Sequence, residues 1–151
     1  MVQEPAVELS RATRAELSDV LALVHECELL ETGVAEAIES FVVARATGSL
    51  IGCAGLEVYG ALGLLRSVAV RASARRTGLG SALVGRITNA ARGQGLRELF
   101  LLTTTASQFF EQRGFQVVER SLVPTEIAES WEFRVGCPQT ALPMRLSLRS
   151  S

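Results

Sequence analysis

The sequence contains no lysine, so all fifteen of its basic residues are arginine. Aromatic residues make up only 5% of the chain, so its core must be built mainly from aliphatic side chains. No hydrophobic run reaches the about 18 residues that a membrane-spanning helix needs, and the N-terminus lacks a signal-peptide pattern. The formal net charge of −1 argues against a nucleic-acid-binding surface. We therefore expect a soluble, cytoplasmic protein that binds neither a membrane nor a nucleic acid.

Cysteine is also scarce. The three cysteines, Cys27, Cys53 and Cys137, are scattered and lack the spacing of metal ligands. We therefore expect reduced, mostly buried thiols, no metal site and no thiol nucleophile.

The length of 151 residues suits one domain, and no repeat or linker divides the chain, so a single domain is expected over residues 1–151.

What the sequence does contain is a succession of short strand patterns and amphipathic helices. Thr13 and Glu16 form a capping box, and the apolar spacing after them predicts a helix that ends near Leu30. Further helices are predicted at 81–92 and 107–113, and short ones at 31–36 and 124–130. Strands are predicted at 6–12, 41–46, 50–58, 64–70, 98–103, 115–119 and 141–148. This order predicts a mixed α/β (α+β) sheet with helices on both faces.

The most informative segment runs from Ser67 to Gly80 and joins a strand to a helix. Its short polar loop carries Arg75 and Arg76, and the segment ends in G-L-G at 78–80. The first N–H groups of a helix have no internal acceptor, the helix dipole adds positive charge there, and glycine allows close approach. The segment is therefore expected to hold a phosphate. A P-loop fits poorly because lysine is absent, and a dinucleotide-binding fingerprint fits poorly because Leu83 occupies the third glycine position.

Residues 75–80 read R-x-x-G-x-G and begin five residues after the strand-ending Val70. This resembles the coenzyme A pyrophosphate loop of the GNAT superfamily of N-acetyltransferases. Residues 106–115, A-x-x-F-F-x-x-x-G-F, resemble the element that lies beside the pantetheine in that superfamily, and the order of elements matches through the whole chain. The resemblance implies a mainly antiparallel sheet of six to seven strands with splayed central strands, and acetyl-CoA as co-substrate. The alternative is an ordinary strand–turn–helix connection with two solvated arginines.

A closer resemblance is carried by G-C-A-G-L-E-V-Y-G at 52–60, by L-F-L-L-T-T-T-A at 99–106 and by Trp131-Glu132-Phe133 with Cys137-Pro138. These segments are similar to the arsenic-resistance-associated (ArsN2-like) N-acetyltransferases. The resemblance implies an amino-acid-like acceptor linked to arsenic or another toxicant. Cys137-Pro138 could line the acceptor pocket, or Cys137 could be a buried structural thiol.

The superfamily resemblance assigns the coenzyme A contacts. The backbone of Val68–Val70 would bind the pantetheine like an added strand, with an N–H near Val68 beside the thioester oxygen. Backbone N–H groups from Arg76 to Ser81 would hold the pyrophosphate, with the side chains of Arg75 and Arg76 adding charge-assisted contacts. The full set of expected cofactor-binding residues is Val68, Ala69, Val70, Arg75, Arg76, Thr77, Gly78, Leu79, Gly80, Ser81, Thr103, Phe110 and Arg113.

The catalytic candidates are Glu57 and Tyr59. In the superfamily a tyrosine often protonates the leaving thiolate, but Phe110 occupies that position here and has no proton to donate. Glu57 is the candidate general base, because a partly buried carboxylate acting through water suits an amine substrate; the alternative is a solvated strand glutamate. Tyr59, the only tyrosine, could act as an acid or shape the acceptor pocket, or it could be a half-buried aromatic at a strand end.

Arg66 and Thr104 are the candidates for binding the acceptor. Arg66 interrupts an apolar strand and could hold a substrate carboxylate or oxyanion, or it could simply face solvent. Thr103, Thr104 and Thr105 form a polar run at a strand end that offers either substrate contacts or ordinary turn hydroxyls. His25, the only histidine, is expected on a helix face without a catalytic role.

The leading hypothesis is an acetyl-CoA-dependent N-acetyltransferase that acts on a small-molecule amine. The alternative, which Phe110 keeps open, is an acyl-CoA-binding sensor that has lost catalysis. A nucleotide-binding α/β domain is a third alternative. Dimers are common in the superfamily, so the resemblance is also compatible with a homodimer.

Overall fold

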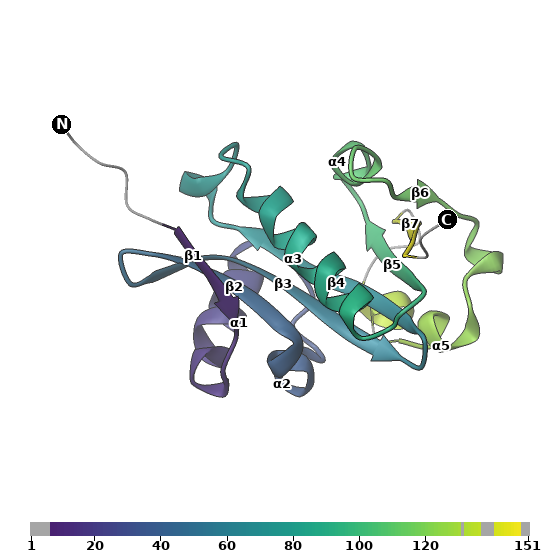
Figure 1. The fold of residues 1–151 in the computed structure, drawn as a ribbon, viewed down its shortest axis with the longest axis horizontal. Helices are drawn as coiled ribbons and strands as arrows, with labels where there is room; N and C mark the ends of the chain where they lie inside the picture. The colour runs from purple at the N-terminus through teal and green to yellow at the C-terminus, as the bar shows by residue number, and fades with distance from the viewer. Residues whose placement is uncertain (1–6, 131, 137–140, 149–151) are drawn as a thin grey trace. The chain divides into compact units, whose positions relative to one another are not determined.

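The computed structural model describes residues 7–130, 132–136 and 141–148. In these residues seven strands form one sheet with the order β1-β2-β3-β4-β5-β7-β6 (Figure 1). The strands are β1 (Val7–Arg11), β2 (Phe41–Ala46), β3 (Ser49–Tyr59), β4 (Leu62–Val70), β5 (Glu98–Thr103), β6 (Gln116–Val117) and β7 (Leu142–Ser147). The helices are α1 (Leu17–Glu26), α2 (Val34–Ala37), α3 (Leu79–Gly93), α4 (Ser107–Glu111) and α5 (Thr125–Ala128), with a π-helical turn η5 (Glu132–Gly136).

The strands of this sheet pair mainly antiparallel. Antiparallel ladders join β1 to β2, β2 to β3, β5 to β7 and β6 to β7. The strands β4 and β5 run parallel, and their ladder covers only Leu62–Leu64 against Glu98–Phe100, although β4 continues to Val70 and β5 to Thr103. The mixed, mainly antiparallel sheet and the short pairing of its central strands confirm the expected fold class.

Internal contacts group the chain into two compact units. Unit 1 consists of Met1–Gly55 and Ser67–Ile87, and unit 2 consists of Leu56–Arg66 and Thr88–Ser151. The boundaries fall inside β3, β4 and α3, so each of these elements contributes to both units. The assignment of residues 1–151 to a single domain stays a prediction.

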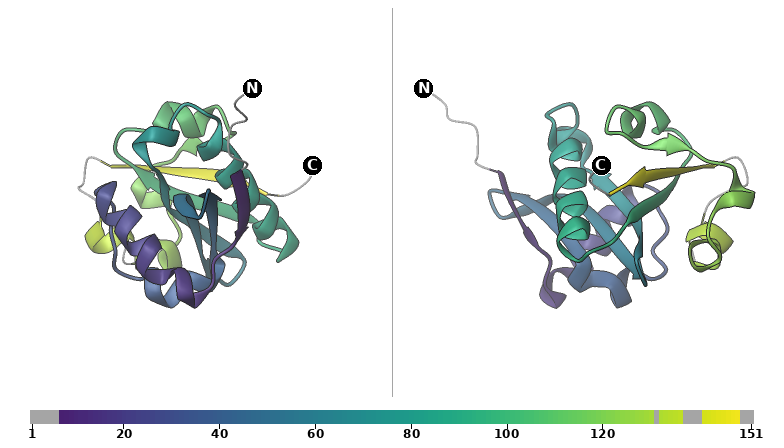
Figure 2. Two further views of the ribbon diagram at one scale, coloured as in Figure 1. Left: turned by 90° about the vertical axis from the view of Figure 1, so that its left-hand side faces the viewer. Right: turned by 45° about the vertical axis from the view of Figure 1, so that its right-hand side comes forward.

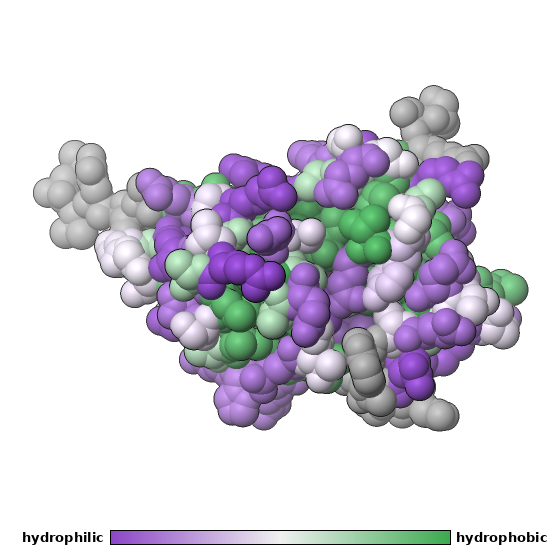
Figure 3. Space-filling view, turned by 90° about the horizontal axis from the view of Figure 1, so that it is seen from below, coloured by the Kyte–Doolittle hydropathy of each residue, from purple (hydrophilic) through white to green (hydrophobic). Residues whose placement is uncertain are grey.

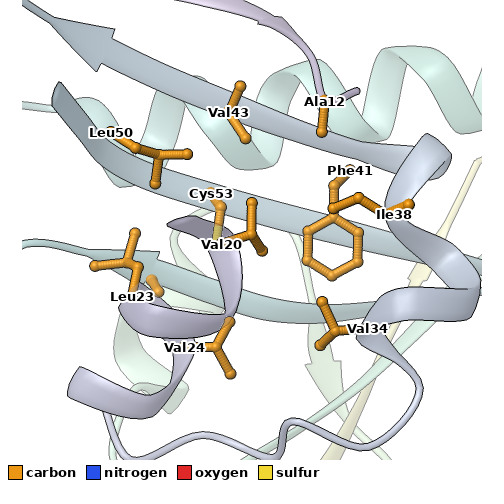
Figure 4. Packing of buried hydrophobic residues seen from close by; sticks show 11 residues of the cluster. Ala12, Val20, Leu23, Val24, Val34, Ile38, Phe41, Val43, Leu50 and Cys53 are labelled. Atoms are coloured by element: carbon orange, nitrogen blue, oxygen red, sulfur yellow. The ribbon is translucent and has the colours of Figure 1, made fainter. Parts of the chain in front are cut away.

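Helix α1 covers one face of the strands of unit 1. Its apolar residues recur at helical spacing, and Val20, Leu23 and Val24 are buried. Figure 4 shows these side chains pointing towards Cys53 and its neighbours on the strands, with the ring of Phe41 beside residues of α2 and the turn after it. The cluster that they form consists of Ala12, Val20, Leu23, Val24, Val34, Ile38, Phe41, Val43, Leu50, Cys53 and Ala69.

Helix α3 covers the opposite face of the same strands. Neighbouring residues of a strand point to opposite faces, and Cys53 points towards α1. A Cβ atom at Gly52 would lie 2.9 Å from Leu83 Cδ1 and 3.2 Å from Leu79 Cδ2, two side chains of α3. Glycine at position 52 therefore lets α3 lie close against the sheet, and Figure 2 shows α1 and α3 on opposite sides of the strands of unit 1.

Unit 2 has an apolar cluster of its own. The buried members are Leu62, Leu64, Phe100, Val123 and Ile127. Partly buried side chains packed against them are Tyr59, Val118, Ala128 and Phe133. Because these residues come from β3, β4, β5, α5 and η5, the cluster holds the late helical segments against the strands of the same unit.

Some boundaries differ from those expected. The first helix ends at Glu26 rather than near Leu30, because Glu28 adopts a left-handed conformation with φ of 60°. Glu28 N donates to His25 O and Leu29 N donates to Val24 O, both at 3.0 Å, which is the Schellman pattern of a helix end.

The predicted strand at 115–119 is reduced to Gln116–Val117. The chain turns after Glu119 into a short 3-10 segment, Arg120–Leu122, so the strand cannot continue. In contrast, α3 starts two residues earlier than predicted, at Leu79. Trp131, Cys137 and Pro138, which contributed to the closer family resemblance, lie outside the described residues.

Hydrophilic side chains surround the hydrophobic ones on the face that Figure 3 displays. Among the residues that the structure describes, the most exposed large hydrophobic one is Leu122, at 73%. Isolated exposed residues of this kind are normal on a protein surface. Within the described parts of the chain, no helix is both long enough and apolar enough to span a membrane.

Candidate active site

Strand β4 carries a conformational irregularity just before the segment expected to bind coenzyme A. Ser67 has a φ of 56°, although it is buried in the strand and is not glycine. Its carbonyl oxygen lies 3.3 Å from Cys53 Sγ, which donates to it. A left-handed residue inside a strand turns the following backbone groups out of the regular ladder, and such positions are concentrated at functional sites.

The loop between β4 and α3 contains two more left-handed residues. Arg76 has a φ of 66° and Gly78 a φ of 85°. A Cβ atom at Gly78 would meet nothing within 4 Å, so the conformation rather than the available space favours glycine there. Ala82 N donates to Gly78 O at 3.1 Å and closes the first turn of α3, so the N–H groups of residues 79–81 precede the helical ladder. Left-handed residues in a turn before a helix N-terminus are typical of backbone geometries that bind anions.

The side chain of Arg75 folds back onto the end of β4. Its Nε donates to Val70 O at 3.0 Å, and its Nη2 lies 3.8 Å from Cys27 Sγ. Thr77 Oγ1 donates to Ala74 O at 2.6 Å and stabilises the same loop. The side chains of Arg75 and Arg76 are exposed, so their charges are available beside the helix N-terminus.

Unit 2 contains a group of charged and polar side chains, Glu57, Tyr59, Arg66 and Glu132. Glu57 and Tyr59 are two residues apart on β3 and therefore point to the same face of the sheet. Tyr59 Oη donates to Glu57 Oε1, and Arg66 Nη1 lies 2.5 Å from Glu57 Oε2. Arg66 Nη2 lies 3.9 Å from Glu132 Oε2. The Arg66 side chain is fully buried, whereas that of Glu57 is 13% exposed, so solvent reaches the group at Glu57.

Burial governs the protonation of two members of this group. It raises the pKa of Tyr59, and the neighbouring Glu57 carboxylate, which accepts the hydroxyl proton in a hydrogen bond, raises it further. Burial also raises the pKa of Glu132; the Arg66 guanidinium opposes that shift, and the charge of Glu57 adds to it. Tyr59 therefore stays protonated and neutral beside an Arg66–Glu57 ion pair.

Helix α4 and the residues around it form an aromatic cluster in unit 2. The ring of Phe110 lies edge-to-face on Phe109 and on Phe115, with centroid distances of 5.0 Å and 5.7 Å. The Arg113 guanidinium lies over the Phe109 ring, 3.7 Å from its centroid, and Arg113 Nη1 donates to Phe109 O at 2.6 Å. Phe110 is thus part of the packing, and its ring offers no proton.

The threonine run splits into two roles. Thr103 is buried, and its hydroxyl accepts a hydrogen bond of 3.0 Å from Ala106 N, the residue that precedes α4. This contact fits the ordinary turn hydroxyl that was one of the two expectations. Thr104 and Thr105 are exposed, so their hydroxyls remain accessible at the end of β5.

The structure brings together three of the residues selected from the sequence, Glu57, Tyr59 and Arg66, and adds Glu132, which sequence reasoning missed. Arg66 does not face solvent, as one expectation had it, but is held by carboxylates. Alternation along β3 could have indicated that Glu57 and Tyr59 share a face. Glu132 gave no such signal, because it lies on an irregular turn far along the chain. Residues 67–81, which are expected to bind coenzyme A, belong to unit 1, and this charged group belongs to unit 2.

The cysteines do not form a metal site within the described residues, where no group of three or more His, Cys, Asp or Glu side chains could hold an ion. Cys53 is fully buried, and burial raises its pKa to about 12. Cys27 is partly buried, and Cys137 lies outside the described residues. His25 is exposed on α1 and lies 3.0 Å from Glu31, as expected for a helix-face residue.

Comparison with known proteins adds relatives of defined activity. The chain is 30% identical over 143 residues to the amino-acid acetyltransferase of Yersinia pseudotuberculosis (serotype O:1b, strain IP 31758). The aligned region covers 89% of this chain and 32% of the relative. The chain thus spans about a third of the length of the curated relatives it matches.

Solved structures with a similar fold include several that are at least 25% identical. N-acetylglutamate synthase from Neisseria gonorrhoeae, in complex with coenzyme A and N-acetyl-glutamate, aligns with a TM-score of 0.84 at 25% identity. That alignment covers 99% of this chain and 37% of the synthase. Rv2747 of Mycobacterium tuberculosis, in complex with CoA, aligns with a TM-score of 0.80 at 27% identity and covers 94% of this chain and 99% of the other.

The family model that matches the chain is the acetyltransferase (GNAT) domain, over residues 37–117. The matched region includes β4 with the left-handed Ser67, the loop with Arg76 and Gly78, and the whole of α3. It covers more than half of the 151 residues. The chain belongs to the GNAT acetyltransferase domain family.

Proposed function

We propose that this protein is an acetyl-CoA-dependent N-acetyltransferase that acetylates the amine of an amino acid or an amino-acid-like compound. The observation that carries the proposal is the family match over the β4–α3 segment, whose left-handed residues precede the N-terminus of α3. The amino-acid acceptor is supported by the Yersinia relative named amino-acid acetyltransferase and by the N-acetyl-glutamate bound in the Neisseria synthase.

Each part of the donor site has a physical reason. The N–H groups of residues 76–81 and the side chains of Arg75 and Arg76 would bind the pyrophosphate of coenzyme A. The backbone of Val68–Val70, which follows the irregular Ser67, would bind the pantetheine as an added strand and direct an N–H at the thioester oxygen. Thr103, Phe110 and Arg113 would lie along the cofactor, Phe110 by its ring alone.

Glu57 is the proposed general base. The amine must lose its proton to attack the thioester carbonyl, the C–S bond breaks, and the thiol of coenzyme A is released. Glu57, which is ion-paired to Arg66 and partly accessible, would take up the amine proton directly or through water. Tyr59 would hold and orient this carboxylate, and its raised pKa makes it a weak proton donor to the thiolate. Arg66, buried between carboxylates, would act through Glu57 more than by holding a substrate carboxylate, whereas the accessible Thr104 would contact the acceptor.

Binding of the donor is tested by thermal denaturation. Acetyl-CoA binds only the folded protein, so it should raise the Tm. The double variant Arg75→Ala/Gly80→Ile should lose that rise, because it removes a loop charge and places a branched side chain in the first turn of α3. The matched control is Arg92→Ala at the exposed end of the same helix, which should keep the rise. An unchanged rise in the double variant would contradict the donor site.

Turnover is tested by release of thiol from acetyl-CoA in the presence of single amino acids. An arsenic-bearing amino-acid analogue and simple amines complete the panel, so that the arsenic-linked acceptor is compared directly with ordinary amino acids. Glu57→Gln should lower kcat by about 10²-fold or more, as removal of a general base does. Binding of acetyl-CoA without turnover on any amine would instead support the acyl-CoA-binding sensor. This function remains the second candidate because the side chain of Phe110 has no acidic group that could protonate the leaving thiolate.

A further inference from the structure

Val70, the last residue of β4, directs its carbonyl oxygen away from the neighbouring strand β3. Arg71 N donates to Ile51 O of β3 at 2.8 Å. Because the N–H and the C=O of one trans peptide group point in opposite directions, the carbonyl of Val70 points away from that strand. On this other side of β4 the ladder covers only Leu62–Leu64, so it does not reach Val70. The sheet therefore leaves Val70 O to another donor.

The side chain of Arg75 supplies that donor. Its Nε donates to Val70 O at 3.0 Å, and its Nη2 lies 3.8 Å from Cys27 Sγ. Cys27 Sγ in turn lies 3.9 Å from the same carbonyl oxygen. All three residues belong to unit 1, so the guanidinium is held at the end of β4 by contacts within one compact unit.

These contacts leave the charge of Arg75 without an anion. The nearby Arg71 pairs with Glu26, with 3.9 Å between Nε and Oε2, whereas among the residues that the structure describes no carboxylate lies within ion-pair distance of Arg75. A guanidinium binds an anionic oxygen more strongly than a carbonyl oxygen or a thiol. The Arg75 side chain is also exposed, so a phosphate that reaches the loop can draw the guanidinium away from Val70 O.

We propose that Arg75 makes the protein selective for acetyl thioesters that carry a pyrophosphate, because it covers Val70 O until a pyrophosphate withdraws the guanidinium. This inference rests on the proposed function, in which the backbone of Val68–Val70 would bind the pantetheine. An amide N–H of the pantetheine needs a carbonyl acceptor on this strand, and Arg75 occupies the one at Val70. A donor with a pyrophosphate replaces that contact by charge-assisted hydrogen bonds, whereas a donor without one displaces the side chain without compensation.

The selectivity follows from two positions of one side chain. A pantetheine without phosphates binds only to the fraction of molecules in which Arg75 has left Val70 O, and its apparent affinity is reduced by that fraction. A pyrophosphate on the loop favours the position in which the carbonyl is uncovered. By linkage, the pantetheine and the pyrophosphate then strengthen each other's binding by the same factor. The two parts of coenzyme A are therefore recognised cooperatively.

The first test measures the binding of acetyl-CoA and of S-acetyl-pantetheine by isothermal titration calorimetry. Arg75→Ala uncovers Val70 O, so S-acetyl-pantetheine should bind about three- to tenfold more tightly than to the wild type. Acetyl-CoA should bind about tenfold more weakly, because the lost charge-assisted hydrogen bonds to its pyrophosphate outweigh the uncovered carbonyl. Changes in the same direction for both donors, or an unchanged affinity for S-acetyl-pantetheine, would overturn the inference.

The matched control is Arg76→Ala, which removes an exposed charge from the same loop and leaves Val70 O covered. It should weaken the binding of acetyl-CoA and leave the affinity for S-acetyl-pantetheine as in the wild type. A gain for S-acetyl-pantetheine in Arg76→Ala equal to that in Arg75→Ala would show that the charge of the loop, rather than the cover on Val70 O, excludes this donor.

The second test needs no substitution in the protein that shows the effect. Saturating inorganic pyrophosphate should draw Arg75 away from Val70 O and strengthen the binding of S-acetyl-pantetheine to the wild type by about three- to tenfold. In Arg75→Ala the same addition should have no effect, because the carbonyl is already uncovered. An affinity of the wild type that pyrophosphate leaves unchanged or lowers would overturn the inference.

The two tests separate the inference from the proposed function. If the wild type binds acetyl-CoA, but neither Arg75→Ala nor pyrophosphate changes its affinity for S-acetyl-pantetheine, the proposed donor site stands and the selectivity through Arg75 is overturned. If both donors bind as expected but no amine is acetylated, the acetyltransferase reaction fails and the selectivity stands. If the wild type binds neither donor, the donor site and the selectivity are overturned together.

Discussion

At the residue scale, the end of α1 depends on a side chain in an unfavourable conformation. Glu28 occupies the left-handed position of the Schellman motif, which is usually glycine. A left-handed backbone costs a non-glycine residue about 1–2 kcal/mol. Glu28→Gly should therefore raise the free energy of unfolding by about 1 kcal/mol, measured by urea denaturation. Ala22→Gly, at an exposed residue inside the helix, is the control and should lower it by about 1 kcal/mol. Equal effects at the two positions would contradict this account.

Some residues of the candidate site could be predicted from the sequence, and others could not. Glu57 and Tyr59 were predictable as neighbours, because alternate residues of a strand share a face. Arg66, the ion-pair partner of Glu57, lies on the next strand. The turn at Gly60 indicates that these two strands form a hairpin. Glu132 was not predictable, because no period relates a π-helical turn to a strand. The left-handed Ser67 was not predictable either, because nothing in its residue type favours that conformation.

At the scale of elements, the packing of β2 against β3 depends on a glycine in β3. Gly55 pairs with Phe41, and a Cβ atom at Gly55 would lie 2.4 Å from two carbons of the Phe41 ring. The ring therefore covers β3 where β3 has no side chain. Gly55→Ala should displace this fully buried ring and lower the free energy of unfolding by about 1–3 kcal/mol, measured by urea denaturation.

The control for that strand is a glycine in α3. A Cβ atom at Gly85 would meet nothing within 4 Å, and the residue is exposed in the helix. Gly85→Ala should raise the free energy of unfolding by about 0.5–1 kcal/mol, because alanine restricts the unfolded chain and favours the helix. If Gly55→Ala did not lower the free energy of unfolding, the packing of the Phe41 ring on β3 would not require glycine at position 55.

The elements themselves were largely predictable. Clear periods in the sequence marked β2, β3, β4, β5 and α3, and the structure moves their ends by only a few residues. The strand predicted at 115–119 was longer than the observed β6. A short apolar stretch of sequence does not show at which residue the pairing with a neighbouring strand ends. The early end of α1 was missed because the residue that stops it is a glutamate rather than the glycine that usually gives this signal.

At the scale of the whole molecule, stability should fall on the alkaline side. Burial raises the pKa of Cys53 to about 12, whereas its ordinary value is 9.0. In the unfolded chain the thiol ionises from about pH 9, but in the folded protein it stays protonated, so ionisation favours the unfolded state between these values. The loss reaches at most about 4 kcal/mol at the alkaline end. The free energy of unfolding measured against pH should therefore fall more steeply in the wild type than in Cys53→Ala.

Tyr59 provides an internal check on this alkaline slope. Its pKa is also raised by burial and by Glu57, so Tyr59→Phe should remove a separate part of the slope. The two substitutions together should flatten the curve more than either alone, since Cys53 lies in unit 1 and Tyr59 in unit 2. A slope that neither substitution changes would show that other groups dominate alkaline unfolding.

The division inside β3, β4 and α3 has a consequence for how this chain can change during evolution. The boundaries at Gly55, Arg66 and Ile87 mean that neither unit is a continuous stretch of sequence. A recombination event or truncation cannot exchange one unit without cutting a strand or a helix, and neither unit can be inherited as a separate cassette. New acceptor specificities should therefore arise by substitutions within the existing elements and by insertions in the loops between them, rather than by replacement of one half of the molecule.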